Sequence, residues 1–249
     1  MKTILITGAT SGFGEAIARR FSNDGWRLIL LGRRADRLDT LAKELGTPCA
    51  TLNADVRSRK TVFETIAALP KSFAEIDVLV NNAGLALGME GAHKADLDDW
   101  ETMVDTNCKG LMYVTRAVLP GMVERGCGHV VNIGSTASNY PYPGGNAYGA
   151  TKAFVKQFSL NLRADLQGTN VRVTNLEPGL AETEFSMVRF KGDKEKAATV
   201  YKGMQPLTGQ DVAEACAWCV NLPPHVNVNR MEIMPTAQAF GPFAVHRRI

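Results

Sequence analysis

The segment Thr7-Gly8-Ala9-Thr10-Ser11-Gly12-Phe13-Gly14 decides how this chain folds, because it separates a short apolar run from a helical pattern. Residues 3–6 precede it and are typical of a buried strand, while residues 14–23 follow it with helical periodicity. Glycines in such a turn let the backbone approach a phosphate closely, since no side chain intervenes. The free N–H groups and the dipole of the following helix also favour a phosphate. The segment therefore predicts a strand–turn–helix unit that binds a pyrophosphate, although the same glycines also suit a purely structural turn.

The alternation of short apolar runs and amphipathic stretches continues to about residue 235. Six further strands are expected at residues 27–31, 49–53, 78–80, 129–133, 172–176 and 231–234, and helices at 14–23, 38–45, 100–122, 154–166 and 210–222. Continuous apolar runs indicate strands buried on both faces, and strand–helix alternation indicates a parallel sheet. We therefore predict an α/β chain: a single-domain Rossmann-type, doubly wound sheet of about seven parallel strands with helices on both faces, over residues 1–249.

The composition is that of an ordinary globular protein. Of the 249 residues, 45% are hydrophobic and 21% are charged, and the formal net charge is +3. This charge is too small and too dispersed to indicate nucleic acid or an anionic membrane as a partner. No stretch approaches the roughly 20 apolar residues of a membrane span, and the first residues lack a signal-peptide pattern. We therefore expect a cytoplasmic protein, and no metal site is expected.

The five cysteines are an odd number, which argues against a secreted disulfide framework. Cys216 and Cys219 form a C-x-x-C pair, and redox pairs of this kind are activated at a helix N-terminus. Here the pair lies inside the expected helix 210–222, where small apolar side chains face the core. Structural packing is therefore the favoured interpretation, and redox chemistry the alternative.

The end of the second expected strand bears on the type of dinucleotide. In a dinucleotide-binding fold, an acidic residue at this point hydrogen-bonds the ribose 2′-hydroxyl of NAD. This chain has Arg33 and Arg34 instead, and guanidinium groups can bind a 2′-phosphate through charge-assisted, bidentate hydrogen bonds. Together with the glycine-rich turn, the two arginines favour NADP over NAD. The alternative is that they only cover the end of the strand.

Tyr148 and Lys152 are four residues apart at the start of the strongest helical pattern, so both side chains lie on one helix face. An ammonium group near a phenol stabilises the phenolate and lowers the phenol pKa from its usual value of about 10. Such a tyrosine can exchange a proton with an alcohol or carbonyl near neutral pH. Ser135 follows the expected strand 129–133 and is placed to hold the substrate oxygen. A lone Tyr/Lys pair is common on helix surfaces, so this interpretation depends on the combination of motifs.

That combination resembles the short-chain dehydrogenase/reductase family over nearly the whole chain. TGATSGFG at 7–14 matches the family's T-G-x-x-x-G-x-G cofactor motif, and NNAG at 81–84 matches its N-N-A-G motif. Asn107, Ser135, Tyr148 and Lys152 fall where the family has its Asn-Ser-Tyr-Lys tetrad. Pro178 and Gly179, followed by Thr183, resemble its P-G-x-x-x-T contact with the nicotinamide half. Because four motifs occur in the right order at compatible spacings, the probability of a chance resemblance is very small.

The resemblance implies roles for single residues. Tyr148 would be the general acid/base, and Lys152 would bind the nicotinamide ribose and depress the tyrosine pKa. Ser135 would orient the substrate oxygen, and Asn107 would hold a water in a proton relay, although it is also compatible with a helix kink. Asp55 would lie at the adenine ring, although it also suits a turn. The cofactor would be NADP, bound by the residues Gly8, Thr10, Ser11, Gly12, Phe13, Gly14, Arg33, Arg34, Asp55, Val56, Asn82, Ala83, Gly84, Tyr148, Lys152, Pro178, Gly179 and Thr183.

A narrower resemblance concerns the substrate. GLALGM at 84–89, DDWETM at 98–103, NAYGATK at 146–152 and FKGD at 190–193 are similar to the bacterial NADP-dependent 3-hydroxy acid dehydrogenases. The resemblance implies oxidation of serine, allo-threonine or 3-hydroxy acids such as 3-hydroxypropionate, or reduction of malonic semialdehyde. Ser135 and Tyr148 would contact the substrate. A carboxylate needs a cation, and Arg189 and Lys191 are the candidates, unless both are only exposed charges. Residues 180–183 contain less glycine than this branch leads us to expect, a departure that concerns the geometry of the lid.

Two other functions fit the same motifs. A reductase of an uncharged ketone or quinone would keep the tetrad without a carboxylate anchor. A non-catalytic NADP-binding regulatory protein would use the fold alone, but it would have no chemical need of Tyr148 and Lys152.

Residues 178–207 are irregular and charged, and we expect them to form a substrate lid with a short helix after Lys196. The alternative is a solvated surface loop. The tail 241–249 is expected to pack on a neighbouring subunit. Family habit implies a homotetramer packed through helices 100–122 and 154–166.

Overall fold

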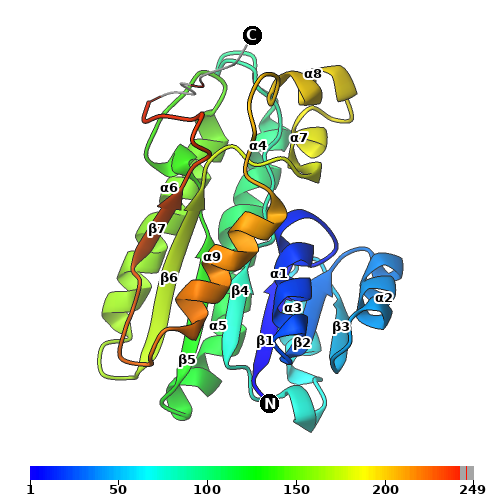
Figure 1. The fold of residues 1–249 in the computed structure, drawn as a ribbon, viewed down its shortest axis with the longest axis vertical. Coiled ribbons are helices and arrows are strands. Elements are labelled where there is room, and N and C mark those ends of the chain that lie inside the picture. The colour runs from blue at the N-terminus through cyan, green and yellow to red at the C-terminus, as the bar shows by residue number, and fades with distance from the viewer. Residues whose placement is uncertain (242–244, 246–249) are drawn as a thin grey trace.

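A single sheet of seven parallel strands runs through the molecule in the order β3-β2-β1-β4-β5-β6-β7 (Figure 1). The computed structural model describes residues 1–241 and 245. The strands are β1 (Thr3–Thr7), β2 (Arg27–Gly32), β3 (Cys49–Asn53), β4 (Val78–Asn81), β5 (Gly128–Ile133), β6 (Val171–Pro178) and β7 (Arg230–Ile233). The predicted α/β class, sheet type and seven strands are confirmed, with strand ends that differ by at most two residues.

Helices cover both faces of the sheet, and each face has its own apolar core (Figure 1). One face is covered by α1 (Gly12–Asn23), α2 (Ala35–Glu44) and α9 (Gly209–Asn221). The other is covered by α3 (Arg59–Ala67), α5 (Leu111–Glu124) and α6 (Asn146–Asp165). Helix α3 was not predicted, because only Val62 of its nine residues is buried and the apolar pattern is correspondingly weak. Burial of apolar side chains on both faces explains why the central strands read as continuous apolar runs.

The strand order reverses at β1, which pairs with β2 on one side and β4 on the other. The crossover connections after β1 and β4 therefore leave in opposite directions. In open parallel sheets this arrangement leaves a crevice at the carboxyl ends of the two strands, and ligands bind there. The TGATSGFG turn and the NNAG segment both lie at this point.

The predicted helix 100–122 is two helices joined by an irregular turn. Helix α4 (Leu97–Val104) is followed by a π-helical segment (Asp105–Gly110) and then by α5. Helix α6 begins eight residues earlier than predicted, at Asn146, so Tyr148 and Lys152 lie in its first two turns. Short 3₁₀ turns occur at Lys71–Phe73 and Thr136–Ser138.

The segment 178–207 holds two short helices, α7 (Glu184–Arg189) and α8 (Lys194–Thr199). Both lie beyond the carboxyl ends of the central strands, at the end of the molecule opposite the N-terminus (Figure 1). Helix α8 overlaps the short helix expected after Lys196, but it begins at Lys194. Of the expected tail 241–249, the structure describes Gly241 and Val245, and the rest lies outside the described residues. Within residues 1–241, no helix is both long and apolar enough to cross a membrane.

The C-x-x-C pair lies in α9 and faces the core. Cys216 and Cys219 are 0% and 1% exposed, and both thiols are free. Burial raises the pKa of both thiols, and it brings that of Cys219 to about 11, so neither is a thiolate at neutral pH. The pair therefore packs as two small apolar side chains.

Candidate active site

The glycine-rich turn has the backbone shape that its sequence requires. Gly8 and Gly12 have φ values of +65° and +56°, which side chains disfavour. Gly14 lies so close to the turn that a Cβ there would be 2.5 Å from Nδ2 of Asn82 and would overlap the carbonyl oxygen of Gly8. The Asn82 amide donates to the carbonyl oxygens of Thr7 at 2.9 Å and Gly8 at 3.1 Å. Asn82 of the NNAG motif therefore holds the turn against the end of β4.

A cleft runs along the carboxyl ends of β1, β2 and β4 and collects most of the predicted cofactor residues. Those that line it are Gly8, Thr10, Ser11, Gly12, Phe13, Arg33, Arg34, Asp55, Val56, Asn82, Ala83, Gly84, Tyr148, Lys152 and Thr183. Gly14 lies beneath the turn, where it permits close packing. Pro178 and Gly179 line an adjoining second cavity instead. Tyr148 and Thr183 line both, so the two cavities meet at the tyrosine.

The two predicted arginines have different surroundings. Arg34 donates to Oγ1 of Thr10 at 2.7 Å and Oγ of Ser11 at 2.9 Å, so it braces the glycine-rich turn. Within the described part of the chain, the exposed Arg33 guanidinium forms no hydrogen bond or ion pair and is free to receive a ligand. A third arginine, Arg37 in the first turn of α2, pairs with Glu184 of α7. Sequence reasoning missed Arg37 and Glu184, because only the fold brings residues 37 and 184 together.

Asp55 follows β3 and lies at the wall of the cleft. Its carboxylate accepts hydrogen bonds from the Arg57 guanidinium, the shortest at 2.7 Å, and from the Arg57 backbone N–H at 3.0 Å. Burial opposes ionisation, but these hydrogen bonds and the charge of Arg57 hold the pKa of Asp55 below its usual value. The side chain therefore presents a fixed acceptor group to the cleft.

Tyr148 lies at the bottom of the joined cavities and is only 8% exposed. Ser135 lines the same cavity as Tyr148 and is near enough to lower the pKa of its phenol. Lys152 is one helical turn further along α6, with Nζ 5.9 Å from the centre of the tyrosine ring. Its ammonium donates to the carbonyl oxygen of Ile133 at 2.8 Å, which points it toward the end of β5.

The pKa values differ from the simple expectation for a Tyr/Lys pair. Burial raises the pKa of Tyr148 to about 12, although the hydrogen bond with Ser135 opposes this. Burial also lowers the pKa of Lys152 to about 8. Lys152 is directed at a carbonyl oxygen rather than at the phenol, so in the protein alone desolvation outweighs its effect on Tyr148. The expected depression of the tyrosine pKa is therefore absent from the chain by itself.

Asn107 lies in the π-helical segment and is buried. Its amide accepts from the Leu85 backbone N–H at 2.9 Å and donates to the Leu85 carbonyl at 2.8 Å. It also donates to Oγ1 of Thr151, at 3.0 Å, next to Lys152. Asn107 thus joins the segment after β4 to helix α6. Such π-helical turns are frequent at functional sites.

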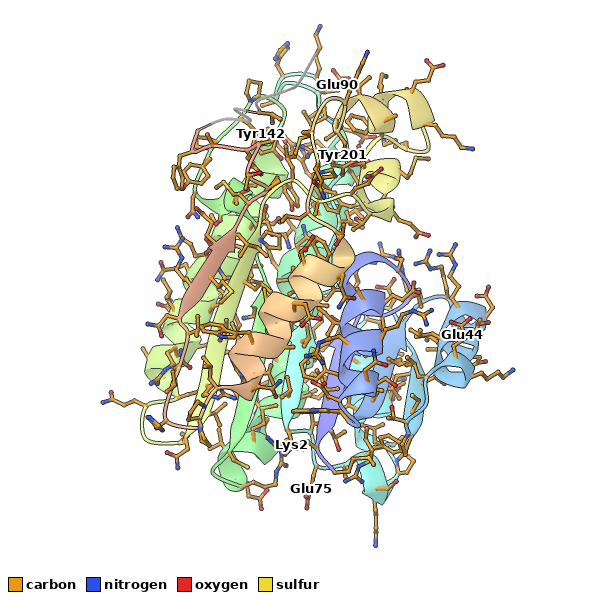
Figure 2. The ribbon with its side chains drawn as sticks, in the orientation of Figure 1. Lys2, Glu44, Glu75, Glu90, Tyr142 and Tyr201 are labelled. Carbon is orange, nitrogen blue, oxygen red and sulfur yellow. The ribbon has the colours of Figure 1, made fainter. Side chains whose placement is uncertain are left out.

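The second cavity opens on the far side of Tyr148 and has apolar and aromatic walls. Arg189, the last residue of α7, lines it and stacks over the rings of Tyr142 and Tyr148, 5.3 Å and 5.6 Å from their centres. Its guanidinium also donates to the Tyr142 hydroxyl at 2.9 Å. Tyr142 and Tyr201, which also line this cavity, lie at the α7–α8 end of the molecule, far from Lys2 and Glu75 at the other end (Figure 2).

Lys191, the other candidate cation, has a different position. Its ammonium pairs with Asp99 of α4 at 2.9 Å, and it lies outside the cavity that contains Ser135 and Tyr148. Sequence reasoning missed the aromatic walls of the cavity, because Tyr142, Phe185 and Tyr201 come from separate segments. Only Tyr142, in the turn between Ser135 and α6, carried a positional signal.

Comparisons with known proteins agree with this geometry. A model of the short chain dehydrogenase family matches residues 2–194. The chain is 61% identical over 245 residues to the NADP-dependent 3-hydroxy acid dehydrogenase YdfG of Salmonella typhi, covering 98% of this chain and 99% of the relative. It is 55% identical over 247 residues to sulfoacetaldehyde reductase 2 of Chromohalobacter salexigens, with 98% of each covered. A solved closed form of serine dehydrogenase complexed with NADP+ matches with a TM-score of 0.93 and 59% identity, covering 99% of this chain and 100% of that one. By its family motifs, fold and relatives, this chain belongs to the short-chain dehydrogenase family.

Proposed function

We propose that this protein is an NADP-dependent oxidoreductase that transfers a hydride between the cofactor and a small 3-hydroxy acid such as L-serine, L-allo-threonine or 3-hydroxypropionate. The observation that carries the proposal is the position of Arg189. A guanidinium group in an otherwise largely apolar cavity, stacked on the ring of Tyr148, is suited to bind a carboxylate near the reacting carbon. Relatives named for 3-hydroxy acids and for serine support the same substrate class.

The cleft fits NADP in its shape and in its charge. The N-cap residue Ser11 makes no side-chain hydrogen bond to the first turn of α1, so the N–H groups of this helix end are available to a pyrophosphate. The positive φ values of Gly8 and Gly12 keep the approach free of side chains. Arg33 stands at the rim, and its guanidinium bonds to none of the residues that the structure describes, so it can receive the 2′-phosphate of an adenosine ribose. Bound NADP would supply the hydride chemistry, and the protein would supply position and proton transfer.

The tetrad handles the proton and the substrate oxygen. Ser135 and Tyr148 line the same cavity, so both hydroxyl groups are placed to reach one substrate oxygen. Tyr148 is the general acid/base, and it needs a cation near it to ionise, because burial alone raises its pKa to about 12. We propose that Lys152, whose pKa burial lowers to about 8, acts from the ribose side of the cleft. Asn107 positions both groups through Thr151 and is the candidate holder of a relay water.

Segment 178–207 serves as the lid in this proposal. It supplies Thr183 to the cofactor cleft and Phe185 and Arg189 to the substrate cavity, so its position affects both ligands. The ring of Phe185 lies 5.6 Å from that of Tyr148 and shields the tyrosine from water. Glu184, between these residues, points away from the substrate toward α2.

A panel of hydroxy acids run with NADP tests the proposal. L-serine, the threonine isomers, 3-hydroxypropionate, isethionate and uncharged secondary alcohols of similar size are compared by the rate of NADPH formation. Turnover is expected for the carboxylates and little for the uncharged alcohols. The relative named for sulfoacetaldehyde makes a sulfonate the second candidate, because a guanidinium binds either anion. Preference for uncharged alcohols would show that the substrate is a neutral ketone or alcohol instead.

We also propose that the protein is a homotetramer in the cytoplasm. Exposed apolar side chains occur along α4 and α5, with Leu97 66% and Val104 41% exposed, and Trp218 of α9 is 55% exposed. Such residues are suited to subunit contacts. Light scattering coupled to size exclusion measures the mass directly, and a monomer of 27.0 kDa would contradict the proposal.

A further inference from the structure

Charged side chains from three elements meet at the rim of the cofactor cleft, beside the predicted 2′-phosphate site. Arg33 and Arg34 follow β2, Arg37 belongs to α2, and Glu184 is the first residue of α7. The Glu184 carboxylate accepts from Nη1 of Arg37 at 2.9 Å through one oxygen and from Nη1 of Arg34 at 3.2 Å through the other. A carboxylate of the chain itself therefore occupies guanidinium donors beside the place that a phosphate would take.

Each nitrogen of the Arg34 guanidinium already donates a hydrogen bond within the protein. Its Nε and Nη2 groups already donate to Thr10 and Ser11 in the glycine-rich turn. The remaining donors are on Nη1, which is where Glu184 binds. A phosphate that reaches Arg34 must therefore share these donors with the Glu184 carboxylate or displace it.

The Glu184 carboxylate and a 2′-phosphate are both anions, so they compete for the same arginines. A phosphate monoester carries about −1.5 to −2 charges at pH 7. Glu184 is ionised there as well, because the hydrogen bond from Arg37 holds its pKa below the usual value. Two anions on the same guanidinium groups repel each other, and the repulsion is moderated because these side chains are 40–48% exposed.

We propose that Glu184 is a specificity-determining residue, whose carboxylate competes with the 2′-phosphate of NADP for Arg34 and Arg37. This inference rests on the proposed NADP dependence. A cofactor without the phosphate leaves Glu184 on its arginines, whereas NADP takes their donors and frees the first residue of α7. By linkage, the free energy of the ion pairs that Glu184 forms with Arg34 and Arg37 must be given up when NADP binds. Binding of NAD leaves these ion pairs in place and does not carry this cost.

The position of α7 gives this competition a consequence for the substrate site. The residue after Glu184 is Phe185, which contacts Tyr148, and the helix ends at Arg189 above the same tyrosine. The identity of the cofactor is thus sensed at one end of a six-residue helix whose other end faces the substrate. The other side of the segment is tied to α4 by the pair of Lys191 and Asp99, which does not involve the cofactor.

Binding constants test the proposal without any turnover. NADPH and NADH are titrated, by nucleotide fluorescence, into the unmutated protein, Glu184→Gln and the control Glu182→Gln at low and moderate salt. Glu182 is an exposed glutamate two residues away that forms no ion pair with the described residues. Glu184→Gln is expected to tighten NADPH by about 3- to 10-fold at low salt and NADH by less than about twofold, with the difference shrinking as salt rises. Glu182→Gln is expected to leave both constants unchanged.

A second pair of variants locates the effect on the arginines. If Glu184 withholds Arg37 from the phosphate, Arg37→Ala weakens NADPH binding more in the Glu184→Gln background than in the unmutated protein. An NADPH constant that is unchanged or weaker in Glu184→Gln, or equal tightening of both cofactors, overturns the inference. Thermal unfolding of each variant checks that it is folded. An unmutated protein that binds NADH as well as NADPH would contradict the NADP proposal itself, which is a separate and distinguishable result.

Discussion

At the scale of single residues, Tyr148 stands where the cofactor cleft and the substrate cavity meet. Ser135 lines the same cavity, the ring of Phe185 lies beside the phenol ring, and the Arg189 guanidinium stacks above it. Burial that raises its pKa to about 12 keeps the phenol protonated until ligands are in place. The residue is therefore poised to give a proton to a carbonyl, and it needs the charge of Lys152 to take one back.

Replacing Tyr148 with phenylalanine is expected to remove the proton transfer and to leave cofactor binding nearly intact. General acid–base catalysis contributes about 10²- to 10⁴-fold, so kcat should fall by that order. NADPH titration should give a dissociation constant within about twofold of the unmutated value, because the phenol ring still fills its place. Turnover that survives at the original rate would exclude Tyr148 as the acid/base.

Arg189→Ala is expected to raise the KM for L-serine by about 10- to 30-fold, because a charge-assisted hydrogen bond to the carboxylate is worth about 2 kcal/mol. Short uncharged alcohols should be unaffected. Lys191→Ala is the matched control, since that side chain pairs with Asp99 outside the cavity. If both variants changed the KM for L-serine equally, Arg189 would not be the residue that binds the carboxylate.

Arg33→Ala is expected to discriminate between the cofactors. Loss of a free guanidinium at the rim should weaken NADPH binding by on the order of 30-fold and leave NADH almost unchanged. Arg34→Ala should weaken both, because Arg34 also braces Thr10 and Ser11 in the glycine-rich turn. Titration of each variant with both nucleotides distinguishes the two roles, and identical profiles would contradict them.

At the scale of elements, the site depends on two local departures from regular structure and on one short helix. The glycine-rich turn brings the end of α1 onto β1, the π-helical segment turns Asn107 toward Leu85, and α7 carries Glu184 and Arg189 at its two ends. The turn and α7 bring groups to the two cavities, and the π-helical segment ties the residues after β4 to α6. They complement Tyr148 and Lys152, which lie in the regular helix α6.

Gly14→Ala tests the contact between α1 and the turn. The added methyl group would overlap the Gly8 carbonyl and the Asn82 amide, so unfolding should become easier by about 1–3 kcal/mol and cofactor binding should weaken. Gly46→Ala is the control, because no atom lies within 4 Å of its Cβ position. Urea unfolding and NADPH titration measure both effects, and a Gly14→Ala protein equal to the control would show that the contact is not tight.

At the scale of the whole molecule, two apolar cores hold seven strands in register and bury polar groups at the ends of the sheet. His129 at the start of β5 is 2% exposed, and its Nε2 is 2.8 Å from Oγ1 of Thr174 on β6. Burial, with a smaller effect of the nearby Arg172, lowers the pKa of His129 to about 3. The folded protein therefore keeps this histidine neutral in mild acid, whereas the unfolded chain protonates it.

The depressed pKa of His129 makes global stability depend on pH with a defined sign. Its contribution is fully present above the unfolded pKa of about 6.5 and is lost as the pH falls toward the folded value of about 3. Between pH 7.5 and 5.0 the loss should be about 2 kcal/mol. His129→Gln should reduce the change in unfolding free energy over that range by this amount, measured by urea unfolding at fixed protein concentration. An unchanged pH dependence would assign the loss to other groups.

Much of the fold was predictable from the sequence because the relevant information is local. Continuous apolar runs mark strands buried on both faces, and helix α9 was correct to within one residue of its ends. Helix α3 was missed because one buried residue makes no periodic pattern. Helix α6 begins earlier than the sequence predicts, because Asn146, Tyr148 and Gly149 are weak helix formers that tertiary packing holds in the helix. The break at 105–110 had one signal, the compatibility of Asn107 with a helix kink, and the helix resumes at Leu111.

The sequence by itself determined the parallel sheet and the glycine-rich turn and pointed to the candidate tetrad, because each carries a recognisable local motif. Only the tertiary structure decided which charged groups face which cavity. It gave Arg33 and Arg34 different surroundings. It also placed Arg189 over Tyr148 and paired Lys191 with Asp99. Finally, it brought Glu184 into contact with Arg37, which is 147 positions away in the sequence. The physical reason is that these contacts depend on where the lid segment crosses the carboxyl ends of the strands, and no local pattern encodes that crossing.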